Sequence, residues 1–424
     1  MLQTNFIKEN KALVIERLTK RNLDATPIVE NITKLDDDRK KTQQELDNLL
    51  AESNRLAKQI GDLFKEGKAA EANTLKLQTA ELKEKSTTLK EQQNNINEEL
   101  TQLLYQLPNI PNQLVPNGKT DADNELIFEN KKQVSLAENN KLPHWELAKN
   151  YDLIDFELGV KITGAGFPVY KGKGAKLQRA LINFFLNEAE KNGYQEIIPP
   201  LMVNEASGYG TGQLPDKEGQ MYYVTEDDLY LIPTAEVPIT NIYRDVILKE
   251  EDFPIKNVGY TPCFRREAGS YGKDVRGLNR LHQFDKVEIV QIQHPEKSYE
   301  TLEAMVEQIK QLLNQLNLPY RIVRLCGGDL GFTSAMTYDF EVYSAAQEKW
   351  LEVSSVSNFE AFQANRLKCR YKDKNGKTNL VHTLNGSALA LPRIMAAILE
   401  NNQTENGINV PEVLVPFTGF NLIN

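Results

Sequence analysis

The sequence predicts an α+β protein in which a long antiparallel two-helix coiled-coil arm precedes an antiparallel β-sheet flanked by helices. Residues 28–107 carry a seven-residue apolar repeat and no proline, which is typical of paired helices. From residue 109 onward, short β-like runs follow one another without regular alternation with helices, which favours an antiparallel sheet. We therefore expect an N-terminal helical arm domain, 1–108, and a second domain, 109–424.

The arm is predicted from two series of heptad positions joined by a turn. A break at "FKEGKAAEA" places that turn near Gly67, and Pro108 ends the second helix because proline cannot continue it. The first series is Leu35, Thr42, Leu49, Leu56 and Leu63 with Ile32, Arg39, Leu46, Ser53 and Ile60, and the second is Leu75, Leu82, Leu89, Ile96 and Leu103.

The function of such an arm stays open at this point. It is either an oligomerisation or spacer element, or a lever that reaches a large partner. Residues 28–107 hold 12 Lys and Arg against 15 Asp and Glu, so their net charge does not favour RNA. Any RNA contact would depend on a few placed lysines, on backbone groups and on shape.

Composition narrows the class of protein. The net charge of −9 over 424 residues argues against a general nucleic-acid coat. Three isolated cysteines without a CxxC pair indicate a reducing cytoplasm and no zinc site. We expect no export and no membrane insertion, because neither an N-terminal apolar segment nor a run of about 20 apolar residues occurs.

The second domain opens with an amphipathic helix over 171–193, capped by Gly193. Further on, 194–203 and 228–240 are interpreted as β runs. The glycine-rich nucleotide motifs GxGxxG and GxxxxGK[ST] are absent, as is the hydrolase motif GxSxG. A nucleotide site, if present, is therefore expected on the sheet.

A predicted hairpin, "CFRREAGSYGKDVRGLNRLHQFDKVEIV" (263–290), is the most informative stretch. Side chains alternate along a strand, so Arg265 and Glu267 share one face. On the second strand one face would carry Arg280, His282, Phe284 and Glu288, and the other Leu281, Val287 and Ile289. The glycine-rich loop 268–279 is either a simple connection or, through Lys273 and Arg276, a clasp for a phosphate-bearing ligand.

The ordered set of motifs resembles the bacterial type of seryl-tRNA synthetase, a class II aminoacyl-tRNA synthetase family. "GYQEIIPP" (193–200) looks like the first class motif, which lies at the dimer interface, "FRRE…RLHQFDKVE" like the second, and "NGSALALPRIMAAILEN" (385–401) like the third. "TGQLP", "PTAEVP" and "EVSSVSNFEAFQANR" resemble stretches of the seryl member, and the arm resembles its tRNA-binding arm. The resemblance covers essentially the whole chain and implies a homodimer.

The resemblance implies an ATP site with Arg265 on the α-phosphate, Glu267 on the adenine amino group, and the ring of Phe284 stacked beneath the base. Arg265 and Arg393 are its catalytic residues, and Glu352 and Ser355 its Mg²⁺ ligands. A guanidinium keeps its charge and suits phosphate oxygens, and a hard cation prefers oxygen ligands. The full ATP set is Arg265, Arg266, Glu267, Leu281, Phe284, Glu352, Val353, Ser354, Ser355 and Arg393.

Serine binding is likewise implied. Its carboxylates are interpreted as binders of ammonium and hydroxyl groups, because the attacking serine carboxylate is already ionised at neutral pH. The set is Thr234, Ala235, Glu236, Arg265, Glu288, Asn385 and Ser387.

Three positions depart from the family pattern. Ala388 replaces a glycine and adds a methyl that we expect beside the nucleotide. Pro392 precedes the motif arginine and is tolerable only near a helix start. Arg266 replaces a serine, and strand alternation points it to the opposite face.

The resulting hypothesis is a homodimeric enzyme that activates L-serine with ATP and Mg²⁺ and transfers it to serine tRNA, and also to selenocysteine tRNA. One alternative is a related ligase that loads an amino acid onto a carrier protein, which would lack the arm. The other is a non-catalytic RNA-binding paralogue, which would have lost these site residues.

Overall fold

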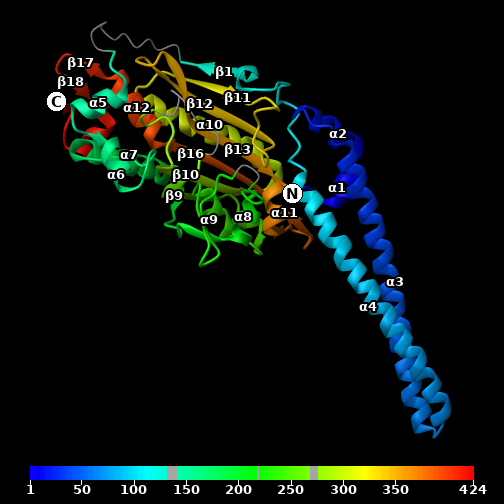
Figure 1. Ribbon diagram of the computed structural model, residues 1–424. Coiled ribbons are helices and arrows are strands. Elements are labelled where there is room, and N and C mark those ends of the chain that lie inside the picture. The colour runs from blue at the N-terminus through cyan, green and yellow to red at the C-terminus, as the bar shows by residue number, and fades with distance from the viewer. Residues whose placement is uncertain (131–140, 217–218, 268–275) are drawn as a thin grey trace. The chain divides into compact units, whose positions relative to one another are not determined.

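The computed structural model describes residues 1–130, 141–216, 219–267 and 276–424. Within them the chain separates into two compact units (Figure 1): residues 1–19 with 23–108, and residues 20–22 with 109–424. Lys273 of the predicted clasp lies outside the described residues. None of the helices in the described ranges combines the length and apolar character that a bilayer span requires.

The first unit is built on two long helices, α3 (Thr26–Lys65) and α4 (Ala69–Gln106), that run antiparallel beside each other (Figure 1). Forty residues at about 1.5 Å each make α3 about 60 Å long. Gly67 forms the turn with a φ of +75°, a conformation that glycine adopts without steric cost. Two short helices, α1 (Thr4–Glu9) and α2 (Lys11–Thr19), precede α3.

The predicted heptad seam is confirmed along both helices. All ten named positions of α3 are buried or half-buried, and the five of α4 are half-buried. The second row of the α4 seam, absent from the prediction, is mostly polar: Ala72, Thr79, Ser86, Gln93 and Leu100. Gln93 Nε2 donates across the seam to Gln43 Oε1 at 3.2 Å. Apolar periodicity alone misses such a row because most of its members are not apolar.

The second unit contains an eight-stranded sheet in the order β1-β11-β12-β13-β16-β10-β9-β4. All neighbours pair antiparallel except β4 with β9, so the predicted fold class is confirmed. The strands are β1 (Glu125–Glu129), β4 (Gln195–Glu196), β9 (Ile255–Phe264), β10 (Gln283–Gln293), β11 (Tyr320–Arg324), β12 (Met336–Ser344), β13 (Lys349–Glu360) and β16 (His382–Ala390).

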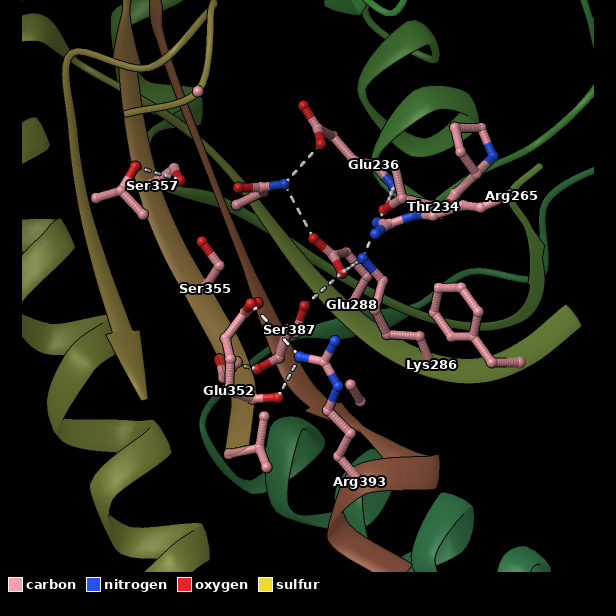
Figure 2. A pocket seen from close by; sticks show the side chains of 18 of the residues that line it. Thr234, Glu236, Arg265, Lys286, Glu288, Glu352, Ser355, Ser357, Ser387 and Arg393 are labelled. Carbon is pink, nitrogen blue, oxygen red and sulfur yellow. Dashed lines mark hydrogen bonds and ion pairs between the residues drawn. The ribbon is translucent and has the colours of Figure 1, made fainter. Parts of the chain in front are cut away.

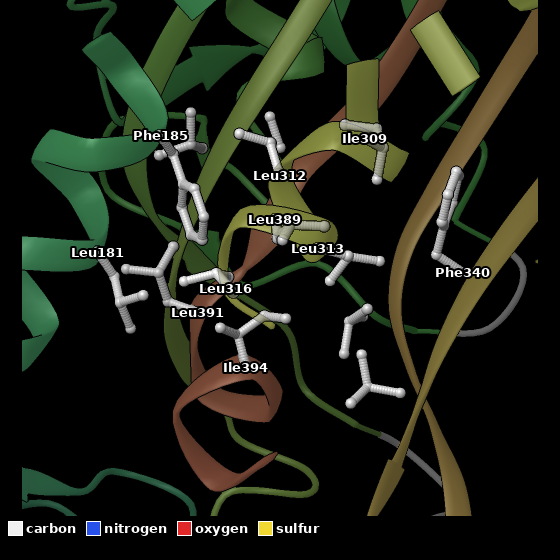
Figure 3. Packing of buried hydrophobic residues seen from close by; sticks show 14 of the residues in the cluster. Leu181, Phe185, Ile309, Leu312, Leu313, Leu316, Phe340, Leu389, Leu391 and Ile394 are labelled. Carbon is white, nitrogen blue, oxygen red and sulfur yellow. The ribbon is translucent and has the colours of Figure 1, made fainter. Parts of the chain in front are cut away.

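One face of this sheet is covered by α7 (Gly172–Lys191), α10 (Ser298–Gln315) and α12 (Leu391–Asn401). Figure 3 shows Leu181 and Phe185 of α7 meeting Leu312 of α10 and Ile394 of α12 in a buried cluster. Val287 and Ile289 of β10 face this cluster. The amphipathic helix predicted over 171–193 is confirmed, including its end at Gly193, where φ is +83°.

The remaining elements surround the sheet. They are α5 (His144–Asn150), α6 (Phe156–Ile162), α8 (Glu205–Thr211), α9 (Glu236–Asn241), α11 (Ala361–Leu367), α13 (Val415–Thr418), β2 (Ile154–Asp155), β3 (Val169–Tyr170), β5 (Met202–Asn204), β6 (Tyr223–Val224), β7 (Leu229–Leu231), β8 (Ile247–Lys249), β14 (Arg370–Lys372), β15 (Thr378–Leu380), β17 (Gln403–Thr404), β18 (Gly407–Asn409) and β19 (Leu422–Ile423). The β run predicted over 228–240 is wrong in its second half, where α9 forms. A short apolar segment is compatible with either a helix or a strand, so the local sequence pattern does not distinguish the two.

The hairpin of β9 and β10 is shorter than predicted. β9 ends at Phe264 and β10 begins at Gln283, so Arg265, Glu267, Arg280 and His282 all lie beyond the paired strands. Strand alternation therefore does not apply to them. Glu267 even adopts a left-handed φ of +47°.

Candidate active site

A cavity of about 550 Å³ opens on the sheet face opposite the apolar cluster. Most of the predicted site residues line it, although they come from five separate segments of the chain. They are Thr234, Glu236, Arg265, Glu267, Leu281, Phe284, Glu288, Glu352, Val353, Ser354, Ser355, Asn385, Ser387 and Arg393. Ala235, buried in an apolar cluster, and Arg266 are not among the lining residues.

Strand β10 supplies the floor of this cavity through alternate residues. Phe284, Lys286 and Glu288 point to the cavity, while Val287 and Ile289 point to the core, as period-two alternation requires. Lys286 was not predicted from the sequence, although it lies on the same strand face as Phe284 and Glu288, between these two predicted site residues. It is buried, and its ammonium lies 2.6 Å from Glu288 Oε2 and donates to Thr234 Oγ1 at 2.8 Å.

Two buried carboxylates share one amide at the polar end of the cavity. Asn385 Nδ2 donates to Glu236 Oε2 at 2.8 Å and to Glu288 Oε1 at 2.9 Å. Ser387 Oγ donates to Glu288 Oε2 at 3.3 Å. Figure 2 shows Glu236 and Glu288 turned toward each other, with Lys286 beside Glu288. The arrangement offers acceptors for a ligand that carries an ammonium and a hydroxyl group.

Glu236 is held in place from its other side by α11. Gln363 Nε2 donates to Glu236 Oε1 at 2.6 Å and to the Thr211 carbonyl at 3.1 Å, and Gln363 Oε1 accepts from Thr383 Oγ1 at 2.7 Å. Burial, and then the nearby charge of Glu288, raises the pKa of Glu236 to about 7. Gln363 lies within the family-like stretch "EVSSVSNFEAFQANR", but it was not among the predicted site residues.

The two predicted catalytic arginines lie on different walls of the cavity. The Arg265 guanidinium lies 5.3 Å from the centroid of the Phe284 ring, and its Nε donates to the Pro233 carbonyl. Arg393 Nη1 donates to the Glu352 carbonyl at 2.7 Å and lies 3.4 Å from Glu352 Oε2. Figure 2 shows this second pair. Both guanidinium groups retain N–H donors for an anionic ligand.

Two expectations near the cavity need revision. His282 does not line it; its ring stacks on Phe167, with centroids 5.5 Å apart, and bonds to the Tyr222 hydroxyl through Nδ1 at 2.8 Å. Leu281, assigned by alternation to the core face, does belong to the buried apolar cluster, but it also lines the cavity. Both differ because they precede the first paired residue of β10.

The three departures from the family pattern are compatible with this geometry. The Ala388 side chain lies in the apolar cluster and not beside the cavity, so the expected methyl next to a nucleotide is wrong. Pro392 lies in the first turn of α12, where its missing N–H removes no helical bond. Arg266 contacts the Tyr222 ring at 5.7 Å and does not line the cavity.

Comparison with known proteins identifies this combination of arm and site. A family model described as "Seryl-tRNA synthetase N-terminal domain" matches residues 1–111, and one described as "tRNA synthetase class II core domain (G, H, P, S and T)" matches residues 222–402. A serine–tRNA ligase of Salinibacter ruber is 50% identical over 99% of this chain and 98% of its own length. The chain belongs to the seryl-tRNA synthetase family.

Solved structures agree with this family. The seryl-tRNA synthetase of Pyrococcus horikoshii, complexed with ATP, superposes with a TM-score of 0.92 at 35% identity and covers 100% of this chain and 99% of its own. The cytoplasmic serine–tRNA ligase of Naegleria fowleri, in complex with AMP, gives a TM-score of 0.87 at 26% identity over 100% of this chain and 99% of its own. The expected seryl-tRNA synthetase membership and the aminoacyl-tRNA ligase class of enzyme are thereby confirmed.

Proposed function

We propose that the cavity activates L-serine with ATP and that the chain then transfers the seryl group to serine tRNA. The observation that carries this proposal is the contrast between the two ends of one cavity. The end at Glu236 and Glu288 is acidic and hydrogen-bonded, whereas the remainder presents Arg265, Arg393 and the Phe284 ring. A small amino acid fits the first end and a nucleotide fits the second.

The acidic end would bind serine in its zwitterionic form. The carboxylates of Glu236 and Glu288 accept from the ammonium and hydroxyl groups of serine. Asn385 and Ser387 donate to these carboxylates, and Thr234 accepts from Lys286. Lys286 offsets the charge of Glu288. A substrate without a hydroxyl would leave these buried groups unpaired, which disfavours alanine strongly.

The reaction needs alignment and charge stabilisation more than proton transfer. The ionised serine carboxylate attacks the α-phosphorus of ATP, a P–O bond forms to the serine oxygen, and pyrophosphate leaves. Arg265 would stabilise the added negative charge on the α-phosphoryl oxygens, and Arg393 and Phe284 would hold the adenine. The terminal ribose hydroxyl of the tRNA then attacks the seryl carbonyl, and AMP leaves.

Magnesium forms part of the proposal. The oxygens of Glu352 and Ser355 line the cavity and suit a hard cation. Within the described residues no cluster of three or more His, Cys, Asp or Glu side chains could hold a metal ion. When bound, magnesium would neutralise phosphate charge.

The assignment of the two domains is also proposed: residues 1–108 as a tRNA-binding arm and 109–424 as the catalytic domain. A homodimer is supported by the segment 198–202, where Ile198 is 87% exposed and Leu201 and Met202 are exposed as well. Selenocysteine tRNA as a second acceptor and a cytoplasmic location belong to the same proposal.

Amino-acid-dependent exchange of pyrophosphate into ATP tests the activation step. We expect exchange with serine and little with alanine, threonine or glycine, followed by charging of serine tRNA. Exchange with a different amino acid would refute the substrate. Exchange with serine but no charging of tRNA would instead favour the carrier-protein ligase.

A further inference from the structure

A fully buried histidine–glutamate pair lies outside the cavity and has no role in the proposal above. His144 begins α5 and Glu400 lies in α12, and both side chains are 0% exposed. Glu400 Oε1 accepts from His144 Nδ1 at 2.6 Å and from the His144 backbone N–H at 2.9 Å. Ser344 Oγ donates to Glu400 Oε2. Burial opposes the charge of Glu400, but the hydrogen bonds from His144 and Ser344 outweigh it and hold its pKa below the ordinary value.

The second ring nitrogen of His144 faces the segment that precedes β10. The backbone N–H of Leu278 donates to His144 Nε2 at 2.8 Å. Nε2 must therefore be unprotonated, and the ring is the neutral tautomer whose Nδ1–H is donated to Glu400. Gly277 lies directly on the ring: a Cβ there would come within 2.2 Å of His144 Nε2. Only glycine fits at this approach.

The same carboxylate reaches the cavity wall by a second route. Gln347, in the turn between β12 and β13, donates through Nε2 to Glu400 Oε1 at 2.9 Å. Its Oε1 accepts from Asn279 Nδ2 at 3.0 Å. Leu278 and Asn279 are both cavity-lining residues. Glu400 is thus linked to the cavity wall by two chains of hydrogen bonds, one through His144 to Leu278 and one through Gln347 to Asn279.

The segment of Leu278 and Asn279 in turn orients Arg393, a predicted nucleotide-binding residue. Arg393 Nε donates to the Asn279 carbonyl at 3.2 Å, while its Nη1 donates to the Glu352 carbonyl. The orientation of the guanidinium therefore depends on where the Asn279 backbone lies. Among the described residues, the carboxylates at the serine end are held by Gln363, Asn385 and Lys286 and not by this network.

We propose that His144 and Glu400, acting through Gln347 and Asn279, are positioning residues for the nucleotide half of the cavity. The inference rests on the proposed function, because it assigns ATP to that half. It requires that loss of the network weakens the use of ATP and leaves the use of serine unchanged. A purely structural role would lower stability without separating the two substrates.

Two variants break the network at different points in the full-length protein. His144→Phe keeps the ring volume but removes the acceptor for the Leu278 N–H. Gln347→Met breaks the second route at a partly exposed side chain, and it tests the proposal even if His144→Phe folds poorly. In serine-dependent pyrophosphate exchange we expect the KM for ATP to rise about tenfold and the KM for serine to stay within about twofold.

One further variant is a control. His382→Phe removes another histidine, which is only partly buried and does not line the cavity. Its Nδ1 lies 2.8 Å from Ser298 Oγ, with which it forms a hydrogen bond. This substitution should lower thermal stability without changing either KM.

The outcomes separate the inference from the proposed function. Absence of serine-dependent exchange in the unmodified protein would refute the proposed function itself. Normal exchange in the unmodified protein, combined with an unchanged KM for ATP in folded Gln347→Met and His144→Phe, would refute the positioning role. A parallel rise of both KM values in these variants would refute it as well.

Discussion

Adjacent arginines at 265 and 266 have opposite environments although their sequence context is the same. Arg265 lines the cavity beside Phe284, whereas Arg266 lies against Tyr222 outside it. The two side chains diverge just beyond Phe264, the last residue of β9. This neighbour pair provides a matched test of the ATP assignment.

We expect Arg265→Ala to lower serine-dependent pyrophosphate exchange by about 10²–10³-fold, because a charge that stabilises the phosphoryl transition state is lost. Arg266→Ala should stay within about threefold of the unmodified protein, since the side chain lies outside the cavity. Steady-state exchange at saturating serine measures both. Equal losses in the two variants would mean that Arg266 also contacts ATP.

Glu236 predicts a pH dependence of serine binding. With its pKa raised to about 7, the carboxyl group gains a proton as the pH falls through 7. The neutral form accepts an ammonium poorly, so the KM for serine should rise by up to about fivefold between pH 7 and pH 6. The KM for ATP serves as the internal control. A flat profile for serine would show that Glu236 stays ionised or does not contact the ammonium.

At the scale of elements, the base of the arm is held by one buried carboxylate. Asp36 in α3 is 0% exposed and binds Lys8 of α1 at 3.0 Å, with Arg39 and Lys40 from its own helix at 2.7 and 2.8 Å. Burial opposes its ionisation, but hydrogen bonds from the three cations hold its pKa below the usual range. The stabilisation is therefore complete at neutral pH and is lost as the pH falls through the lowered pKa.

We expect Asp36→Asn to destabilise the contact between α1 and α3 by about 2 kcal/mol, because three cations lose their common partner. Asp37→Asn is the matched control: that side chain is 63% exposed and contacts only Lys8 in the ion pairs described. We expect a change below about 0.5 kcal/mol there. Amide hydrogen exchange in α1 measures both variants, and equal protection would contradict the assigned role of Asp36.

At the scale of the whole molecule, every residue that lines the cavity belongs to the unit of residues 20–22 and 109–424. Deletion of residues 30–104, with a short glycine-rich link in their place, should therefore leave serine activation within about threefold. Charging of serine tRNA should be lost, because the proposed contact with the tRNA is removed. Exchange and charging assays on the same preparation compare the two steps. Intact charging would refute the role of the arm.

The sequence by itself determined the features that depend on local periodicity and on short motifs. These local features are the heptad seam of α3 and α4, the turn at Gly67, the amphipathic helix α7 and the alternation of Phe284 and Glu288. Each of these was predictable because a helix or strand places every fourth or second side chain on one face. The family motifs added fourteen of the residues that line the cavity.

Only the tertiary structure decided where the strands stop and which distant groups meet. The ends of β9 and β10 moved His282 out of the cavity and Leu281 into it. Gln363 reaches Glu236 across 127 residues, and His144 reaches Glu400 across 256. Such pairs leave no periodic trace in the chain, because packing of separate elements, and not local backbone geometry, brings them into contact.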